Sequence, residues 1–156
     1  MKQETEMVMS TDAKVTKDLM ETLEDGRKGF ADAAEKLSDG DGATLAPKFR
    51  EFSEQRKAMY AELEVLAAKY GDDIDDDGSL AATIHRGWMS LKDAVTGSSP
   101  KGVIDVAEQG EEHAVNEYDK ALEMDLSPEL ADLIRRQLAQ IKSTQAEVKT
   151  LAAAHN

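Results

Sequence analysis

Residues 49–70 read FREFSEQRKAMYAELEVLAAKY, and this stretch decides the fold class. Its mostly apolar positions recur in alternating steps of three and four residues up to Gly71, which is the spacing of one buried helix face, or seam. Such a seam is typical of a helix in a bundle, and its one polar member is Arg56. The seam positions are Phe49, Phe52, Arg56, Met59, Leu63, Leu66 and Tyr70.

The same spacing predicts three further long helices and one shorter helix. A first helix is expected from residue 12, after a cap-forming Ser-Thr-Asp cluster, to the Asp39–Gly42 segment. The last two begin near Pro100 and at Pro128, which follows the cap candidate Ser127. Their seams are Leu19, Leu23, Phe30, Ala34 and Leu37; Ile104, Ala107, Glu111, Ala114, Tyr118 and Ala121; and Leu130, Ile134, Gln137, Ile141, Thr144, Val148 and Leu151.

These segments predict an all-α protein with one bundle domain. The shorter helix follows an acidic stretch and carries Leu80, Ile84, Trp88, Leu91 and Val95 on one face, so it is expected to form a crossover. The expected parts are a flexible segment at 1–11 and a domain at 12–153, made of a hairpin at 12–71, an acidic linker with the crossover helix at 72–99, and a hairpin at 100–153.

The two hairpins resemble each other in sequence. The segment from Glu24 aligns with that from Glu108 at an offset of 84 residues, and the segment from Ala61 aligns with that from Ala146 at an offset of 85. An internal duplication is therefore predicted, although helices rich in Ala, Glu and Lys also resemble one another by chance. Two related hairpins joined by a long connection have the topology of a ferritin-like four-helix bundle.

Composition excludes several kinds of function. The chain of 156 residues has no cysteine, which leaves only oxygen and imidazole ligands for a metal. Its formal net charge of -13, with basic residues scattered among acids, disfavours binding to nucleic acid or to a membrane surface. The acidic N-terminus is unlike a signal peptide, so a cytoplasmic protein is expected.

Three short segments carry a resemblance to a known family. DGRKGF at 25–30, HRGW at 85–88 and GEEHA at 110–114, followed by Tyr118, are similar to an uncharacterised bacterial four-helix-bundle family of the ferritin-like superfamily. The resemblance spans about residues 12–153 and implies the fold but no activity. The family-signature positions are Asp25, Gly26, His85, Arg86, Gly87, Trp88 and Tyr118.

The di-metal site of ferritin-like relatives is only partly represented in the sequence. Such a site takes a Glu from each of two helices and a Glu-x-x-His from each of the other two. Glu111 lies on a seam after a glycine, but the residue that aligns with it in the first hairpin is Arg27. In the second helix, Lys57 stands where a His would be needed. No metal, cofactor or catalytic residue is therefore predicted, and a di-iron protein with an altered site remains the alternative.

A buried polar layer is the structural interpretation of the same residues. Arg27, Arg56 and Glu111 fall at or beside seam positions midway along their helices, and Gln137 or Gln140 is expected to complete the hydrogen bonds. A buried charge persists only when it is paired and hydrogen-bonded. The alternative is that the arginines extend to solvent and Glu111 faces water.

Two other candidate sites are weaker. Asp73, Asp75, Asp77 and Gly78 match the start of a calcium loop, but the twelfth position is Ile84 instead of Glu, so an acidic linker is favoured. Trp88 and Tyr118 are expected to pack in the core.

The sequence thus favours a non-catalytic binding or assembly module without an assigned partner. A stress-related role and self-association through remaining apolar faces are two forms that such a module could take.

Overall fold

The computed structural model describes residues 2–38, 40–69 and 99–155, with side chains from residue 11 onward. These residues form four α-helices and one short 3-10 turn: α1 (Lys2–Ser38), η1 (Ala43–Leu45), α2 (Ala46–Ala67), α5 (Pro100–Leu122) and α6 (Pro128–Ala154). No strand occurs among them, which confirms the all-α prediction. The expected crossover helix and acidic linker at 72–98 lie outside the described residues.

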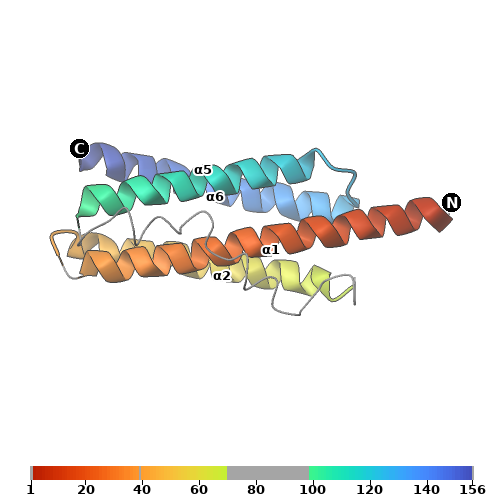
Figure 1. Ribbon diagram of the computed structural model, residues 1–156, viewed down its shortest axis with the longest axis horizontal. Coiled ribbons are helices and arrows are strands. Elements are labelled where there is room, and N and C mark those ends of the chain that lie inside the picture. Colours follow the sequence, from red (N-terminus) through yellow and green to blue (C-terminus); the bar gives the residue numbers. More distant parts are fainter. Residues whose placement is uncertain (1, 39, 70–98, 156) are drawn as a thin grey trace.

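The four helices form two antiparallel hairpins that lie against each other. Figure 1 shows the α5–α6 hairpin above the α1–α2 hairpin, with the long helix axes nearly parallel. Each hairpin packs closely within itself, and α1 also packs along α5. This arrangement is a helical bundle.

The ends of the helices follow local sequence signals. The side chain of Ser99 accepts a hydrogen bond from the backbone N–H of Gly102, so that Ser99 caps α5 and Pro100 occupies its first turn. Ser127 and Pro128 have the same places at the start of α6. Gly42 is required between α1 and α2, because a Cβ there would come within 2.5 Å of the Leu37 side chain.

Helix α1 begins earlier than the sequence pattern predicts. The cap-forming cluster places its start at residue 12, but the helix extends from Lys2. Figure 1 shows this end of α1 running past the turn between α5 and α6. Asp12 lies at the level of that turn, because its Oδ1 accepts a hydrogen bond from the backbone N–H of Ser127 at 3.0 Å. The sequence pattern missed the earlier start, because the helix continues through residues whose Ser and Asp types also favour caps.

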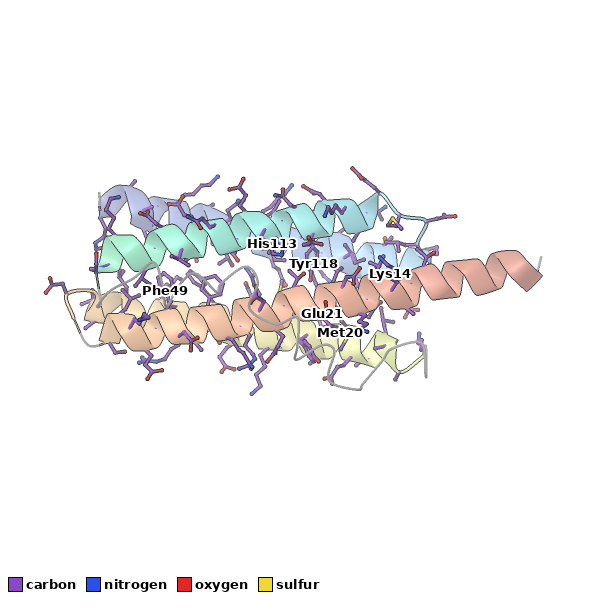
Figure 2. The ribbon with its side chains drawn as sticks, in the orientation of Figure 1. Lys14, Met20, Glu21, Phe49, His113 and Tyr118 are labelled. Carbon is purple, nitrogen blue, oxygen red and sulfur yellow. The ribbon has the colours of Figure 1, made fainter. Side chains whose placement is uncertain are left out.

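The core consists of two apolar clusters, and the predicted seams supply most of both. Of the described seam residues, only Leu151 is not fully buried. The Phe49 cluster consists of Phe30, Ala33, Ala34, Leu37, Ala46, Phe49, Phe52, Val103, Ile104, Val106, Ala107 and Val148. The Tyr118 cluster consists of Val15, Leu19, Met20, Leu23, Met59, Leu63, Leu66, Ala67, Ala114, Tyr118, Ala121, Leu130, Leu133, Ile134, Leu138 and Ile141. Figure 2 shows Phe49 and Met20 towards opposite ends of the bundle.

Among the described residues, none of the helices has an apolar stretch long enough to cross a bilayer.

Candidate functional site

A polar layer separates the two apolar clusters. Each helix passes from one cluster to the other through a break in its apolar seam, and the buried residues at these breaks include one from each helix: Gly26, Arg56, Glu111 and Thr144. The layer therefore lies near the middle of the bundle. Its central contact is an ion pair between α2 and α5.

Arg56 and Glu111 form this ion pair in full burial. Arg56 Nη2 donates a hydrogen bond to Glu111 Oε2 at 2.5 Å, and the two side chains are 0% and 1% exposed. The guanidinium carbon of Arg56 also lies 5.3 Å from the centre of the Phe30 ring, within the range of a cation–π contact. A charge-assisted hydrogen bond and an aromatic face thus offset part of the desolvation of the guanidinium.

Gly26 makes room for the guanidinium on α1. A Cβ at this position would lie 3.3 Å from Arg56 Nη1, which is closer than most Cβ contacts, and 3.6 Å from its Cγ, an ordinary van der Waals distance. Glycine inside a helix lowers stability relative to alanine by about 1 kcal/mol. The close approach of Arg56 is the physical reason for a glycine here.

The ion pair is not saturated by protein groups. Arg56 Nε and Nη1 and Glu111 Oε1 are buried and have no hydrogen-bond partner among the described residues. Burial raises the pKa of the Glu111 carboxyl, while the charge and the hydrogen bond of Arg56 oppose that shift. The pair is thus joined by a single strong hydrogen bond and depends on both partners.

A second buried polar group lies within the Tyr118 cluster. Tyr118 Oη donates to Gln137 Oε1 at 2.7 Å, and Gln137 Nε2 donates to the Met59 carbonyl at 3.0 Å and to Glu62 Oε1 at 3.1 Å. Figure 2 shows Tyr118 between the two hairpins. Burial raises the pKa of the Tyr118 hydroxyl, so this group is a neutral hydrogen-bond donor at physiological pH.

Glu62 connects this inner group to the surface. Its Oε1 accepts from Gln137, and its Oε2 is 3.2 Å from Arg136 Nη2. Both Glu62 and Arg136 line a groove between α2 and α6. A polar chain therefore runs from the surface groove to Tyr118.

Two of the five residues predicted for the polar layer lie outside it. Arg27 pairs with Glu24 on its own helix, has a side chain 31% exposed, and leaves the α1 position of the layer to Gly26. The hydrogen bond to Glu24 raises the pKa of Arg27, although partial burial opposes this shift. Gln140 is exposed on α6. Both predictions were wrong because residues beside a seam have long side chains that reach solvent without leaving the helix.

Three of the five are buried, but they belong to two different groups. Arg56 and Glu111 are in the central layer, whereas Gln137 is fully buried beside Tyr118. The α6 member of the central layer is Thr144, whose hydroxyl donates to Gln55 Oε1 at 2.9 Å. The predicted seam of α6 contains Thr144. However, the spacing of residues along one helix does not determine which residues of the other three helices lie at the same level of the bundle.

Several predicted positions lie outside the described residues. These are His85, Arg86, Gly87 and Trp88 of the family signature and the Asp73–Gly78 segment. Of the other signature positions, Asp25 and Gly26 are buried on α1 and Tyr118 is buried on α5.

The described residues do not fit a di-metal site. Among them, no group of three or more His, Cys, Asp or Glu side chains comes together in a way that could hold a metal ion. Glu111 is a buried carboxylate of the central layer, and its Oε2 is already bonded to a guanidinium. A permanent cation at this place repels a metal ion and neutralises the carboxylate that would bind it.

Comparison with known proteins places the chain in a family. Residues 13–124 match the model described as "Domain of unknown function (DUF2383)", and the chain therefore belongs to this family. The matched part contains Arg56, Glu111 and Tyr118 and ends before α6, which supplies Gln137 and Thr144. A search of curated proteins found no match, and a search of solved structures found none either.

Proposed function

We propose that this protein is a non-catalytic binding or assembly module built on a ferritin-like bundle that does not require metal. The observation that carries the proposal is the Arg56–Glu111 ion pair at the centre of the bundle. In ferritin-like di-metal proteins, carboxylates and imidazoles converge on this part of the bundle to neutralise two ions. Here, one guanidinium neutralises one carboxylate.

The internal sequence repeat and the antiparallel hairpins support the ferritin-like part of the proposal. Two related hairpins joined by a long connection are the arrangement of that superfamily, and residues 70–98 are long enough to supply the connection. Glu111 lies on its seam directly after a glycine, and a metal-binding Glu in such a bundle often has the same position. In this interpretation, the guanidinium of Arg56 has taken the place of the metal ions there.

The non-catalytic part follows from the chemistry of the buried groups. General acids and bases work best when their pKa lies near the operating pH and when a substrate can reach them. Tyr118 is fully buried with a raised pKa, and Arg56 is a permanent cation that only donates hydrogen bonds. These groups therefore hold the interior together and do not exchange protons with a substrate.

Metal content tests the proposal directly. The full chain is purified from cells grown with excess iron, without chelator, and its metals are measured by inductively coupled plasma mass spectrometry. We expect far less than one metal ion per chain and the same thermal unfolding midpoint with and without a chelator. About two iron ions per chain would overturn the proposal and establish the alternative, a di-iron protein with an altered site.

An Arg56→Ala variant is a useful companion to this assay. Removal of the guanidinium leaves Glu111 without its partner, so any latent affinity of the bundle for divalent cations is most visible in this variant. Metal bound by Arg56→Ala but not by the native chain is the expected pattern if Arg56 took the place of a metal. Equal metal in both proteins would contradict that role of Arg56.

A further inference from the structure

The face formed by α2 and α6 differs in charge from the rest of the molecule. Helix α2 has four acidic and four basic residues, and α6 has three acidic and four basic residues. In contrast, α5 has six acidic and two basic residues, and α1 has nine acidic and six basic residues. The formal net charge of -13 is therefore carried outside α2 and α6, which together are close to neutral.

A groove runs between these two helices. It has a volume of about 640 Å³ and is lined by Glu62, Val65, Leu66, Glu129, Asp132, Leu133 and Arg136. Helices α2 and α6 make few direct contacts with each other, whereas the other neighbouring helices of the bundle pack closely. The groove is the result of that separation.

The groove combines an exposed apolar side chain with paired charges at its rim. Val65 is 70% exposed, the largest exposure of any large hydrophobic residue among those described. Beside it, Lys69 Nζ lies 3.0 Å from Glu129 Oε2, and Arg136 Nη2 lies 3.2 Å from Glu62 Oε2. An apolar centre surrounded by polar residues is the general anatomy of a protein–protein interface.

We propose that two copies of this chain pack through their α2–α6 faces, around a twofold axis close to Val65. The inference rests on the proposed assembly role and names its partner as a second copy. In a twofold interface the same patch meets itself, so the patch must be self-complementary. A nearly neutral face whose groove rim carries both acids and bases, in the pairs Lys69–Glu129 and Arg136–Glu62, meets that condition.

Charge also argues against other ways of self-association. Two chains that each carry a net charge of -13 repel one another, and the repulsion is strongest where their acidic sides face each other. Contact through the neutral face holds the acidic α1 and α5 on the outer sides of the pair. A strongly basic partner would instead be attracted to the acidic side, away from this groove.

Sedimentation of the full chain over a range of concentrations tests the proposal. We expect a monomer–dimer equilibrium that added salt strengthens, because salt screens the net repulsion. Val65→Glu is expected to weaken dimerisation tenfold or more, because it places two carboxylates near the axis; a tenfold change corresponds to about 1.4 kcal/mol. Met124→Glu is the matched control, since Met124 is also an exposed large hydrophobic residue, 47% exposed, but follows α5 on the acidic side.

A native chain that stays monomeric at every concentration would overturn the proposal. A dimer that Val65→Glu and Met124→Glu weaken equally, or that neither weakens, would overturn it too, although the assembly role would then stand. Neither result bears on metal content, so failure here is distinguishable from failure of the metal-free bundle. Val65 is exposed and Glu is at least as good a helix former, so at concentrations where both proteins are monomeric Val65→Glu should unfold at the native midpoint or above it.

The absence of cysteine from the chain allows a second measurement. Single Val65→Cys and Met124→Cys variants are treated with a short bis-maleimide and separated by denaturing electrophoresis. We expect the Val65→Cys chains to be joined in pairs in good yield and the Met124→Cys chains to remain single. Equal pairing of both variants would contradict a specific α2–α6 interface.

Discussion

The Arg56–Glu111 pair and the Tyr118–Gln137 group are both buried between the hairpins, but they are completed to different degrees. All three polar side-chain groups of Tyr118–Gln137 have partners: one hydroxyl, one amide oxygen and one amide nitrogen that donates twice. The ion pair has one hydrogen bond, and three of its polar atoms have no partner among the described residues.

This difference separates two ways of placing polar groups in a core. A neutral group that is fully hydrogen-bonded contributes modestly, and its loss is local. A buried ion pair recovers its desolvation energy only through its partner, so that either ion alone is strongly destabilising while the pair can be replaced. The following four changes test whether the two groups behave in these ways.

Removal of one ion should have the largest effect. Glu111→Ala leaves the Arg56 charge buried and unpaired, and we expect the free energy of unfolding to fall by about 3–5 kcal/mol. Urea unfolding followed by circular dichroism measures this loss. Glu112→Ala is the matched control, because Glu112 is exposed one residue further along α5 and its removal should change stability little. An unchanged midpoint for Glu111→Ala would mean that the pair is not buried as described.

Replacement of both ions should act in the opposite direction. The double variant Arg56→Met, Glu111→Leu removes both charges and keeps similar volumes. We expect a bundle as stable as the native one or more stable by about 1–4 kcal/mol. Thermal unfolding of the single and double variants gives the coupling energy of the pair. A double variant less stable than Glu111→Ala would contradict the idea that the unpaired charge is what destabilises.

Removal of the tyrosine hydroxyl should have a smaller effect. Tyr118→Phe keeps the ring in the Tyr118 cluster but leaves Gln137 Oε1 without its donor, and we expect a loss of about 1–2 kcal/mol. Adding Gln137→Leu to this variant completes a double-mutant cycle measured by the same unfolding experiment. A coupling energy near zero would contradict the hydrogen bond between them.

The smallest effect is expected on α1, and its sign depends on Arg56. Gly26→Ala gains about 1 kcal/mol of helix propensity, but its Cβ would press on a guanidinium that cannot move while it is paired. We therefore expect a net loss of about 1 kcal/mol in the native chain. In the Arg56→Met, Glu111→Leu background the same change should become neutral or stabilising. A gain in the free energy of unfolding in both backgrounds would show that Gly26 is not needed to accommodate Arg56.

The fold was largely predictable, because seam periodicity reports which face of each helix is buried. The seams of α2 and α5 identified Arg56 and Glu111 as interior residues on two different helices. The composition of the layer was less predictable. Which residue of α6 stands opposite Arg56 depends on how far the two hairpins slide along each other, and Thr144 takes that place instead of Gln137.

Partners that lie beside a seam were missed for a related reason. Glu62 precedes the seam residue Leu63, and no periodicity distinguishes it from an exposed glutamate. Its long side chain turns inward to Gln137 while its other oxygen meets Arg136 at the surface. Arg27 is the reverse case, since a residue beside the seam of α1 turned outward to Glu24.

The hydrogen bond from the Ser127 amide to Asp12 joins positions 115 residues apart in the chain. In the described helices, most backbone amides donate to carbonyls of their own helix, so their exchange with deuterium reports local fraying or complete unfolding. The exchange of the Ser127 amide depends on α1 lying against the turn that leads into α6. The exchange rate of this one amide therefore measures how often one hairpin opens from the other.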